Sequence, residues 1–209
     1  MPVGPDSAVY PDLLMLGAGP MDRLREAGIA SGPGEVFARH KGLGLLVRRG
    51  VGDEIDSLET FAASDLQYVM ATPRERGARA QYLKTLKSLI GRARTERLQA
   101  REVSDFPGRI AIQHRDIPHA VMNDIAPVGI VFTHLAAFYA DRWPERLRHV
   151  AVPEAESFGT EIRISKTVRP AANPSLVEAF NDFLMLNSPV VYPAAGFSDM
   201  GDGQRDRGD

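Results

Sequence analysis

The stretch Asp12-Leu-Leu-Met-Leu-Gly-Ala-Gly-Pro-Met-Asp-Arg-Leu-Arg-Glu-Ala-Gly28 decides the fold class. It begins with the continuous apolar run Leu13 to Leu16, which is typical of a strand buried on both faces of a parallel sheet. The glycines at 17 and 19 predict a turn, and Pro20 suits the first turn of a helix. Apolar residues then recur at helical spacing until Gly28, a residue type that commonly ends helices. A strand, a glycine turn and a helix form half of a βαβ unit.

Strands and helices alternate along the rest of the chain. Buried strands are predicted at 66–71 and 128–132, and the best amphipathic helix runs from 77 to 90. Long extended links near 36–50 and 148–166 predict two sheets rather than one. We therefore expect an α/β fold with mainly parallel sheets.

The composition of the 209 residues excludes several classes of protein. Lys and Arg total 25 against 27 Asp and Glu, so no general basic charge favours nucleic-acid binding. Cysteine is absent, which excludes disulfides, thiolate nucleophiles and thiolate zinc sites. No apolar stretch approaches the roughly 20 residues of a membrane-spanning helix. The first eight residues have no signal-peptide pattern, and the tail 199–209 is expected to be disordered.

Four predicted junctions between an extended segment and a helix offer backbone amides to a ligand. Ligands of open α/β sheets bind beyond the carboxyl ends of strands, where helix N-termini favour anions. The junctions are Gly17-Ala18-Gly19, Thr72 to Ala78 with Arg74 and Arg76, Gln113-His114-Arg115-Asp116, and Phe132-Thr133-His134. Each has a structural alternative, since a glycine turn is often only a turn and surface arginines often pair locally. The His114-Arg115-Asp116 segment suits a salt-bridged turn equally well.

Patterns typical of enzymes are missing from the sequence. No Ser lies in Gly-x-Ser-x-Gly, the glycine turn matches no nucleotide-binding fingerprint, and the five histidines are scattered without paired carboxylates. We therefore expect no catalytic role, no cofactor and no metal site built by the protein.

Several short motifs follow one another in a characteristic order over residues 10–198. They are Met21-Asp-Arg-Leu-Arg-Glu-Ala-Gly28, Asp56-Ser-Leu-Glu-Thr-Phe61, His114-Arg-Asp-Ile-Pro118, Ala126-Pro-Val-Gly-Ile-Val-Phe132, Asn173-Pro-Ser-Leu-Val-Glu-Ala-Phe-Asn-Asp-Phe-Leu184 and Ala195-Gly-Phe197. In this order they resemble the periplasmic solute-binding proteins of ABC transporters, in particular the molybdate-binding-like branch. The resemblance implies a type II periplasmic-binding fold, in which two crossover strands join two α/β lobes.

The resemblance also implies the domain borders. The crossovers would lie near 40–50 and 153–166, the first lobe would comprise 1–48 and 158–198, and the second lobe 49–157. The family's opening strand–helix–strand has no counterpart, so the first lobe would be incomplete and its sheet would have an uncovered edge. We expect either that the native chain begins further upstream or that this edge pairs with a second copy in a homodimer.

The ligand site follows from the same resemblance. Molybdate binders use serines of the first lobe, a helix start corresponding to Gly77-Ala78, a residue near His114 and a tyrosine that aligns with Phe132. The predicted ligand-binding residues, in a cleft between the lobes, are Gly17, Ala18, Arg76, Gly77, Ala78, His114, Arg115 and Phe132. Phe132 lacks the tyrosine hydroxyl and Arg76 replaces a small residue, so the ligand is expected to be either a molybdate-like oxyanion or a small carboxylate.

Two functions follow as hypotheses. The first is capture of a small anionic or polar ligand for an ABC-type uptake system, with a transporter permease as partner and a periplasmic location. The second is a cytoplasmic regulatory or interaction module that keeps the fold without transport and self-associates. A ligand screen without any response, together with stable self-association, would favour the second.

Overall fold

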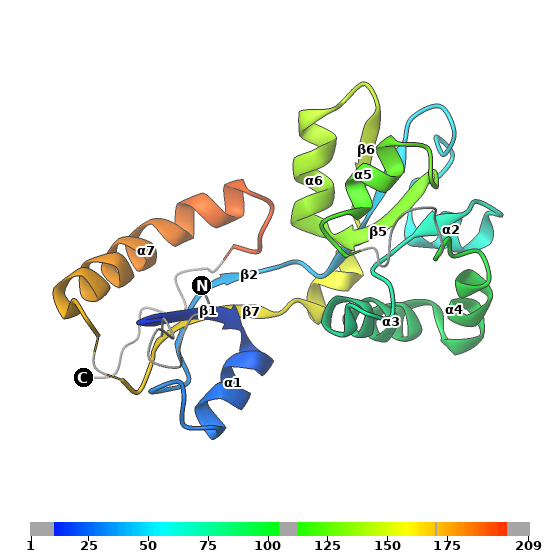
Figure 1. Cartoon of the computed structure of the whole chain (residues 1–209). Helices are drawn as coiled ribbons and strands as arrows, with labels where there is room; N and C mark the ends of the chain where they lie inside the picture. Colours follow the sequence, from blue (N-terminus) through cyan, green and yellow to red (C-terminus); the bar gives the residue numbers. More distant parts are fainter. Residues whose placement is uncertain (1–10, 105–112, 170, 200–209) are drawn as a thin grey trace, which may run out of the picture. The chain divides into compact units, whose positions relative to one another are not determined.

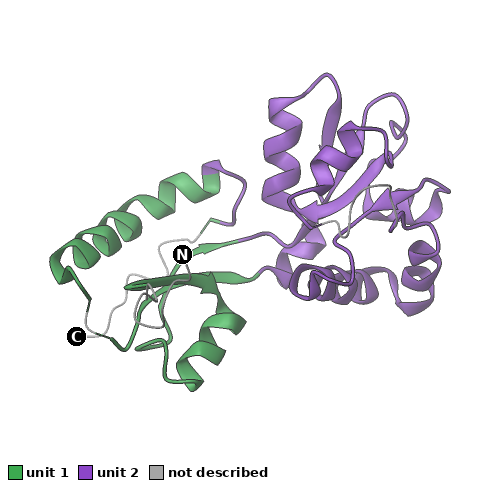
Figure 2. Cartoon of the chain, viewed as in Figure 1, with its two compact units in different colours: residues 1–39, 160–193, 199–209 green, residues 40–159, 194–198 purple. Residues whose placement is uncertain are grey.

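The computed structural model describes residues 11–104, 113–169 and 171–199 (Figure 1). The segment 110–112, for which the sequence predicts a short strand, lies outside the described residues, as does all but Asp199 of the tail predicted as disordered. The chain forms two compact units (Figure 2). Unit 1 comprises residues 1–39, 160–193 and 199–209, and unit 2 comprises residues 40–159 and 194–198.

Unit 1 contains a three-stranded sheet in the order β1-β7-β2. Its elements are β1 (Leu13–Gly17), α1 (Ala18–Glu26), β2 (Glu35–Arg39), β7 (Glu161–Lys166) and α7 (Pro174–Ala194). The opening stretch forms a strand followed by a helix, as predicted, and Gly28 has a left-handed φ of 69° just after the helix. The predicted burial on both faces and the predicted glycine turn are wrong, because β1 is an antiparallel edge strand without a buried residue and Gly17 joins it directly to α1. The long helix predicted from Asn173-Pro174 is also confirmed as α7.

Unit 2 contains a four-stranded sheet in the order β4-β5-β3-β6. Its strands are β3 (Leu43–Arg48), β4 (Tyr68–Val69), β5 (Val128–Phe132) and β6 (Leu147–Val150). Its helices are α2 (Leu58–Ala63), α3 (Arg76–Ile90), α4 (Arg92–Gln99), α5 (Ile117–Met122) and α6 (Thr133–Arg142), with a 3-10 helix over Pro153–Phe158. The predicted lobe border at 48/49 differs from the unit border at 39/40 because β3 pairs within this sheet.

The α/β class is confirmed, but the prediction of mainly parallel sheets is wrong. Among the described pairs of strands, only β4–β5 is parallel. In each sheet, one strand is the first that the chain forms after it passes from the other unit. This strand is antiparallel to both of its neighbours. In unit 1 the inserted strand is β7, between β1 and β2, and in unit 2 it is β3, between β5 and β6. Strands β1 and β2, which α1 joins, run in the same direction but are separated by β7. Strands β5 and β6, which α6 joins, are separated in the same way by β3.

The core of unit 2 surrounds its sheet. Leu45 and Val128 are fully buried on the strands, and Tyr82 and Val121 are fully buried on α3 and α5. At Gly129 of β5 a Cβ would lie 2.6 Å from Ile117 Cγ2, so α5 packs directly on the backbone of the strand. Of the described helices, none combines the length and the hydropathy that crossing a bilayer requires.

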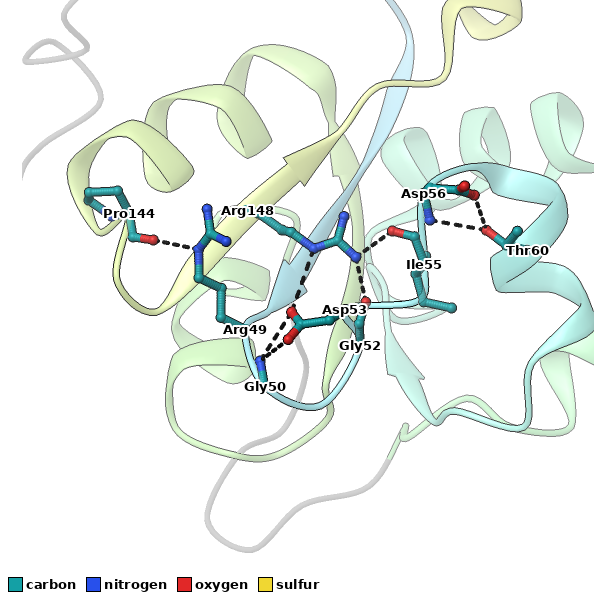
Figure 3. Close-up of polar contacts among 9 residues, drawn as sticks. All are labelled: Arg49, Gly50, Gly52, Asp53, Ile55, Asp56, Thr60, Pro144 and Arg148. Atoms are coloured by element: carbon teal, nitrogen blue, oxygen red, sulfur yellow. Dashed lines mark hydrogen bonds and ion pairs between the residues drawn. The ribbon is translucent and has the colours of Figure 1, made fainter.

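The loop after β3 is fixed by Arg148 of β6 (Figure 3). The Arg148 guanidinium donates hydrogen bonds to the carbonyl oxygens of Gly52 and Ile55, and its Nε lies 4.0 Å from Asp53 Oδ1. Arg49 lies in the same region but donates one hydrogen bond, of 2.6 Å, to the carbonyl oxygen of Pro144. Arg148 therefore bonds backbone groups within the loop, whereas Arg49 makes a single bond from the loop to Pro144.

We expect Arg148→Leu to lower the free energy of unfolding by about 2 kcal/mol, because two carbonyl oxygens lose their charged donor. Arg49→Leu is the matched control and should cost less than about 1 kcal/mol, because it removes a single exposed bond. Urea unfolding monitored by circular dichroism measures both values. Equal losses in the two variants would contradict the role assigned to Arg148.

Candidate functional site

Aromatic rings from separate segments of unit 2 gather around Phe132, the last residue of β5. Ring centroids lie 4.7 Å from it for His40, 4.9 Å for Tyr82, 5.5 Å for His114 and 5.9 Å for His134. We call these five residues together with Phe197, which stacks on His134, the Phe132 cluster. The cluster lies at the carboxyl end of β5, where α/β sheets bind their ligands.

Gly42 connects His40 of the Phe132 cluster to Thr133, the residue after Phe132. Its backbone N–H donates to His40 Nδ1 at 3.2 Å, and its carbonyl oxygen accepts a hydrogen bond from the Thr133 N–H at 3.0 Å. His40 is only 8% exposed, its Nδ1 accepts the hydrogen bond from Gly42, and its Nε2 lies 3.5 Å from Gln81 Nε2. These bonds hold His40 beside the start of α6.

The start of α3 leaves its first-turn amides open. Glu75 is the N-cap residue but its side chain makes no capping bond, and the first turn contains no acidic residue. Gly77 is exposed, and a Cβ placed on it would meet nothing within 4 Å. No side chain of the N-cap residue therefore satisfies the first-turn amides at the positive end of this 15-residue helix.

The Glu75 carboxylate fixes His114 next to this helix start. Its Oε2 accepts a hydrogen bond of 2.5 Å from the backbone N–H of His114, and its Oε1 bonds with His114 Nδ1. The His114 side chain thus pairs with Glu75, and Asp116 Oδ2 accepts a hydrogen bond of 3.1 Å from the Gln113 N–H. Burial and the nearby charge of Glu75 raise the pKa of Tyr82 well above its ordinary value.

His134 is an uncharged polar group at the start of α6. Its ring lies between Phe197, with centroids 4.3 Å apart, and Phe132. Burial lowers its pKa to about 4, with smaller contributions from His40 and His114, so the ring is neutral at pH 7. Its buried Nδ1 has no hydrogen-bond partner within the described part of the chain. An unpaired buried nitrogen of this kind is available to a ligand.

Positive charge is present at the rim of this region. Arg74, Arg76 and Arg115 are exposed, and none of them forms an ion pair with another described residue. Arg76 begins α3, and Arg115 follows His114 directly. The two remaining predicted residues, Gly17 and Ala18, belong to unit 1, where Gly17 is the N-cap of α1 without a side-chain capping bond. The structure thus brings the predicted residues of unit 2 together around one helix start.

A comparison with protein families decides the kind of protein. Residues 5–189 match the family model for bacterial extracellular solute-binding proteins. The chain belongs to this solute-binding family. Proteins of this family bind solutes for transport and are not enzymes, as the sequence predicts. No curated protein sequence matches the chain.

Solved structures show that the solute-binding protein has the type II periplasmic-binding fold. The sulfate-binding protein SubI from Mycobacterium tuberculosis has a TM-score of 0.68 at 16% identity, and the match covers 94% of this chain and 71% of SubI. A solute-binding protein from Bordetella parapertussis has a TM-score of 0.64 at 13% identity, with 90% and 68% covered. A periplasmic thiamin binding protein has a TM-score of 0.62 at 11% identity, with 88% and 62% covered. At these identities the likeness concerns the fold alone.

Three residues that build this site, His40, Glu75 and His134, were not among the predicted ligand-binding residues of this solute-binding protein, although Glu75 and His134 lie in two of the predicted junctions. His40 and His134 stand alone in the sequence, and Glu75 is hidden between two arginines. Their signal is position, since His40 follows β2 directly and His134 follows β5. No group of three or more His, Cys, Asp or Glu side chains that could hold a metal ion occurs among the described residues.

Two surface hollows of about 430 and 400 Å³ lie away from the Phe132 cluster. The first is lined by Arg94, Arg97 and Arg101. Arg94 pairs with Glu59 at 2.7 Å, and Arg101 donates to carbonyl oxygens at the end of α2, so most of this positive charge is neutralised or engaged. The charges and hydrogen bonds therefore favour the Phe132 cluster, rather than either of these two hollows, as the candidate ligand site.

Proposed function

We propose that this solute-binding protein captures a small anion, either a molybdate-like oxyanion or a small carboxylate, at the start of α3 beside the Phe132 cluster. The observation that carries the proposal is the uncapped first turn of α3, with open space over Gly77 and no acidic residue in the turn. Helix N-termini of this kind bind anions through backbone N–H groups and the helix dipole. The captured anion would pass to an ABC-type permease outside the cytoplasm.

The charges around Gly77 support a ligand that is negative but small. Arg76 and Arg115 supply positive charge without a partner among the described residues. The Glu75 carboxylate opposes an anion, but two hydrogen bonds from His114 already occupy it. The unpaired Nδ1 of His134 offers one further polar contact. A ligand with several acceptor oxygens matches this set of donors better than a cation does.

Thermal-shift measurements with molybdate, tungstate, sulfate, phosphate and acetate test the proposal. A ligand at 100 times its dissociation constant should raise the melting temperature by about 5–10 °C. Gly77→Asp should weaken binding at least about ten-fold, because its carboxylate occupies the positive end of α3. Without ligand the same variant should be as stable as the wild type or slightly more so, because acidic residues stabilise helix N-termini.

Ser88→Asp is the matched control, because it adds the same charge at an exposed position in the same helix. Its ligand response should equal that of the wild type, whereas Arg115→Gln should remove most of it. Wild-type affinity in Gly77→Asp would reject the start of α3 as the site. If none of the five anions raises the melting temperature, the proposal that the ligand is a small anion is wrong.

A further inference from the structure

The last helix of unit 1 carries an exposed apolar face. The side chains on this face are between 42% and 79% exposed, and they are Leu176, Phe180, Phe183, Leu186, Val190 and Val191. The other side of α7 packs within unit 1, where Val177 and Leu184 are buried and Tyr192 contacts the Phe37 ring at 5.3 Å. The helix is therefore apolar on the side that packs within unit 1 and again on the exposed side.

The exposed residues follow the spacing of a helix that packs against another helix. Leu176, Phe180, Phe183, Asn187 and Val190 are separated alternately by four and three positions, so they form one stripe along α7. Asn187 is the polar member of the stripe, and its Nδ2 donates to the Phe183 carbonyl oxygen at 2.7 Å. The stripe extends over about 21 Å, at 1.5 Å per residue.

The area of this face is close to what a stable interface requires. Each of its apolar side chains exposes on the order of 100 Å², so the face presents roughly 600 Å², which is at the upper limit for a monomer. A typical interface buries about 800 Å² on each partner. Polar side chains at the border of α7 can supply the remainder. By contrast, the edge strand β1 exposes a single large apolar side chain, Met15.

We propose that α7 packs against α7 of a second copy of this chain, in a two-fold symmetric dimer. A stripe that is apolar at every position but Asn187 is complementary to itself, as an isologous interface demands. The acidic residues of α7, Glu178 and Asp182, both lie in its N-terminal half, and the helix contains no Lys or Arg. An antiparallel pair keeps these charges apart and aligns the helix dipoles favourably, so the two helices run in opposite directions.

Light scattering after size-exclusion chromatography of the 209-residue chain tests the dimer. We expect a mass of twice 22.9 kDa for the wild type at micromolar concentration. Leu186→Glu should raise the dissociation constant of the dimer at least ten-fold without changing the melting temperature of the monomer, because Leu186 is 79% exposed. Phe138→Glu is the control, since Phe138 is 57% exposed on α6 of unit 2, and it should remain dimeric.

Oxidative crosslinking provides a second test, because the chain contains no cysteine. Phe183→Cys, at the midpoint of the stripe where two antiparallel helices meet at the two-fold axis, should form a covalent dimer, and Lys87→Cys at an exposed position of α3 should not. A monomeric wild type up to about 100 μM, or equal crosslinking of both variants, would overturn the proposal. Either outcome would mean that a polypeptide segment other than α7 of a second copy covers the exposed face of α7. The ligand response is measured separately, so failure of the dimer leaves the proposed function intact.

Discussion

Gly42→Ala should lower the free energy of unfolding by about 4 kcal/mol, the largest loss expected from a single methyl group in this chain. Gly42 has a φ of 78°, in the left-handed region that side chains rarely adopt. A Cβ on it would lie 2.2 Å from the carbonyl oxygen of Ala155. That oxygen belongs to the backbone, so it cannot rotate away, and the chain itself must move. Because Gly42 bonds both His40 and Thr133, the movement would also disturb the Phe132 cluster.

Gly50→Ala separates the two causes of this loss. Gly50 has a φ of 80°, but a Cβ on it would meet nothing within 4 Å. It should therefore lose only about 1 kcal/mol, from backbone strain alone. Urea unfolding of both variants measures the difference. Similar losses at the two positions would mean that the approach of Ala155 to Gly42 is not a constraint on the fold.

The sequence predicts the local elements of the protein better than their pairing. The stretch from Asp12 to Gly28 predicts a strand and a helix through apolar spacing and glycines, and both form, but the helix begins at Ala18, inside the predicted turn, and the strand lies at the antiparallel edge of its sheet. The direction of neighbouring strands depends on where the chain crosses between units, which apolar spacing does not encode. Strand β3 is as apolar as a parallel strand, with all but its last residue buried, yet it pairs antiparallel on both sides.

The candidate site was predictable in part for the same reason. Gly77, His114 and Phe132 come from motifs that resemble a family, and they lie around one helix start in the structure. The contacts that hold them depend on residues far apart in the sequence. Glu75 bonds with His114, which is 39 positions away. Nothing in the local sequence around either residue indicates such a pairing, so it is visible only in the structure.

His134 of the Phe132 cluster should make the stability of the protein depend on pH. His134 has a pKa of about 4 in the folded state, mainly because it is buried, against an ordinary value of 6.5. Between these values the unfolded chain binds a proton that the folded chain does not, so stability is complete above pH 6.5 and falls as the pH is lowered towards 4. The loss should amount to about 3 kcal/mol. Burial also lowers the pKa of His149, which adds to the loss with the same sign.

His134→Phe should remove most of this dependence, because phenylalanine preserves the stack between Phe132 and Phe197 and carries no titrating group. The measurement is the urea midpoint at pH 7.0 and pH 4.5, where the wild type should weaken strongly and the variant only slightly. His119→Phe, at an exposed position, should weaken as much as the wild type. If His134→Phe loses as much stability as the wild type on acidification, His134 takes up its proton without unfolding, and the cluster opens to water around it.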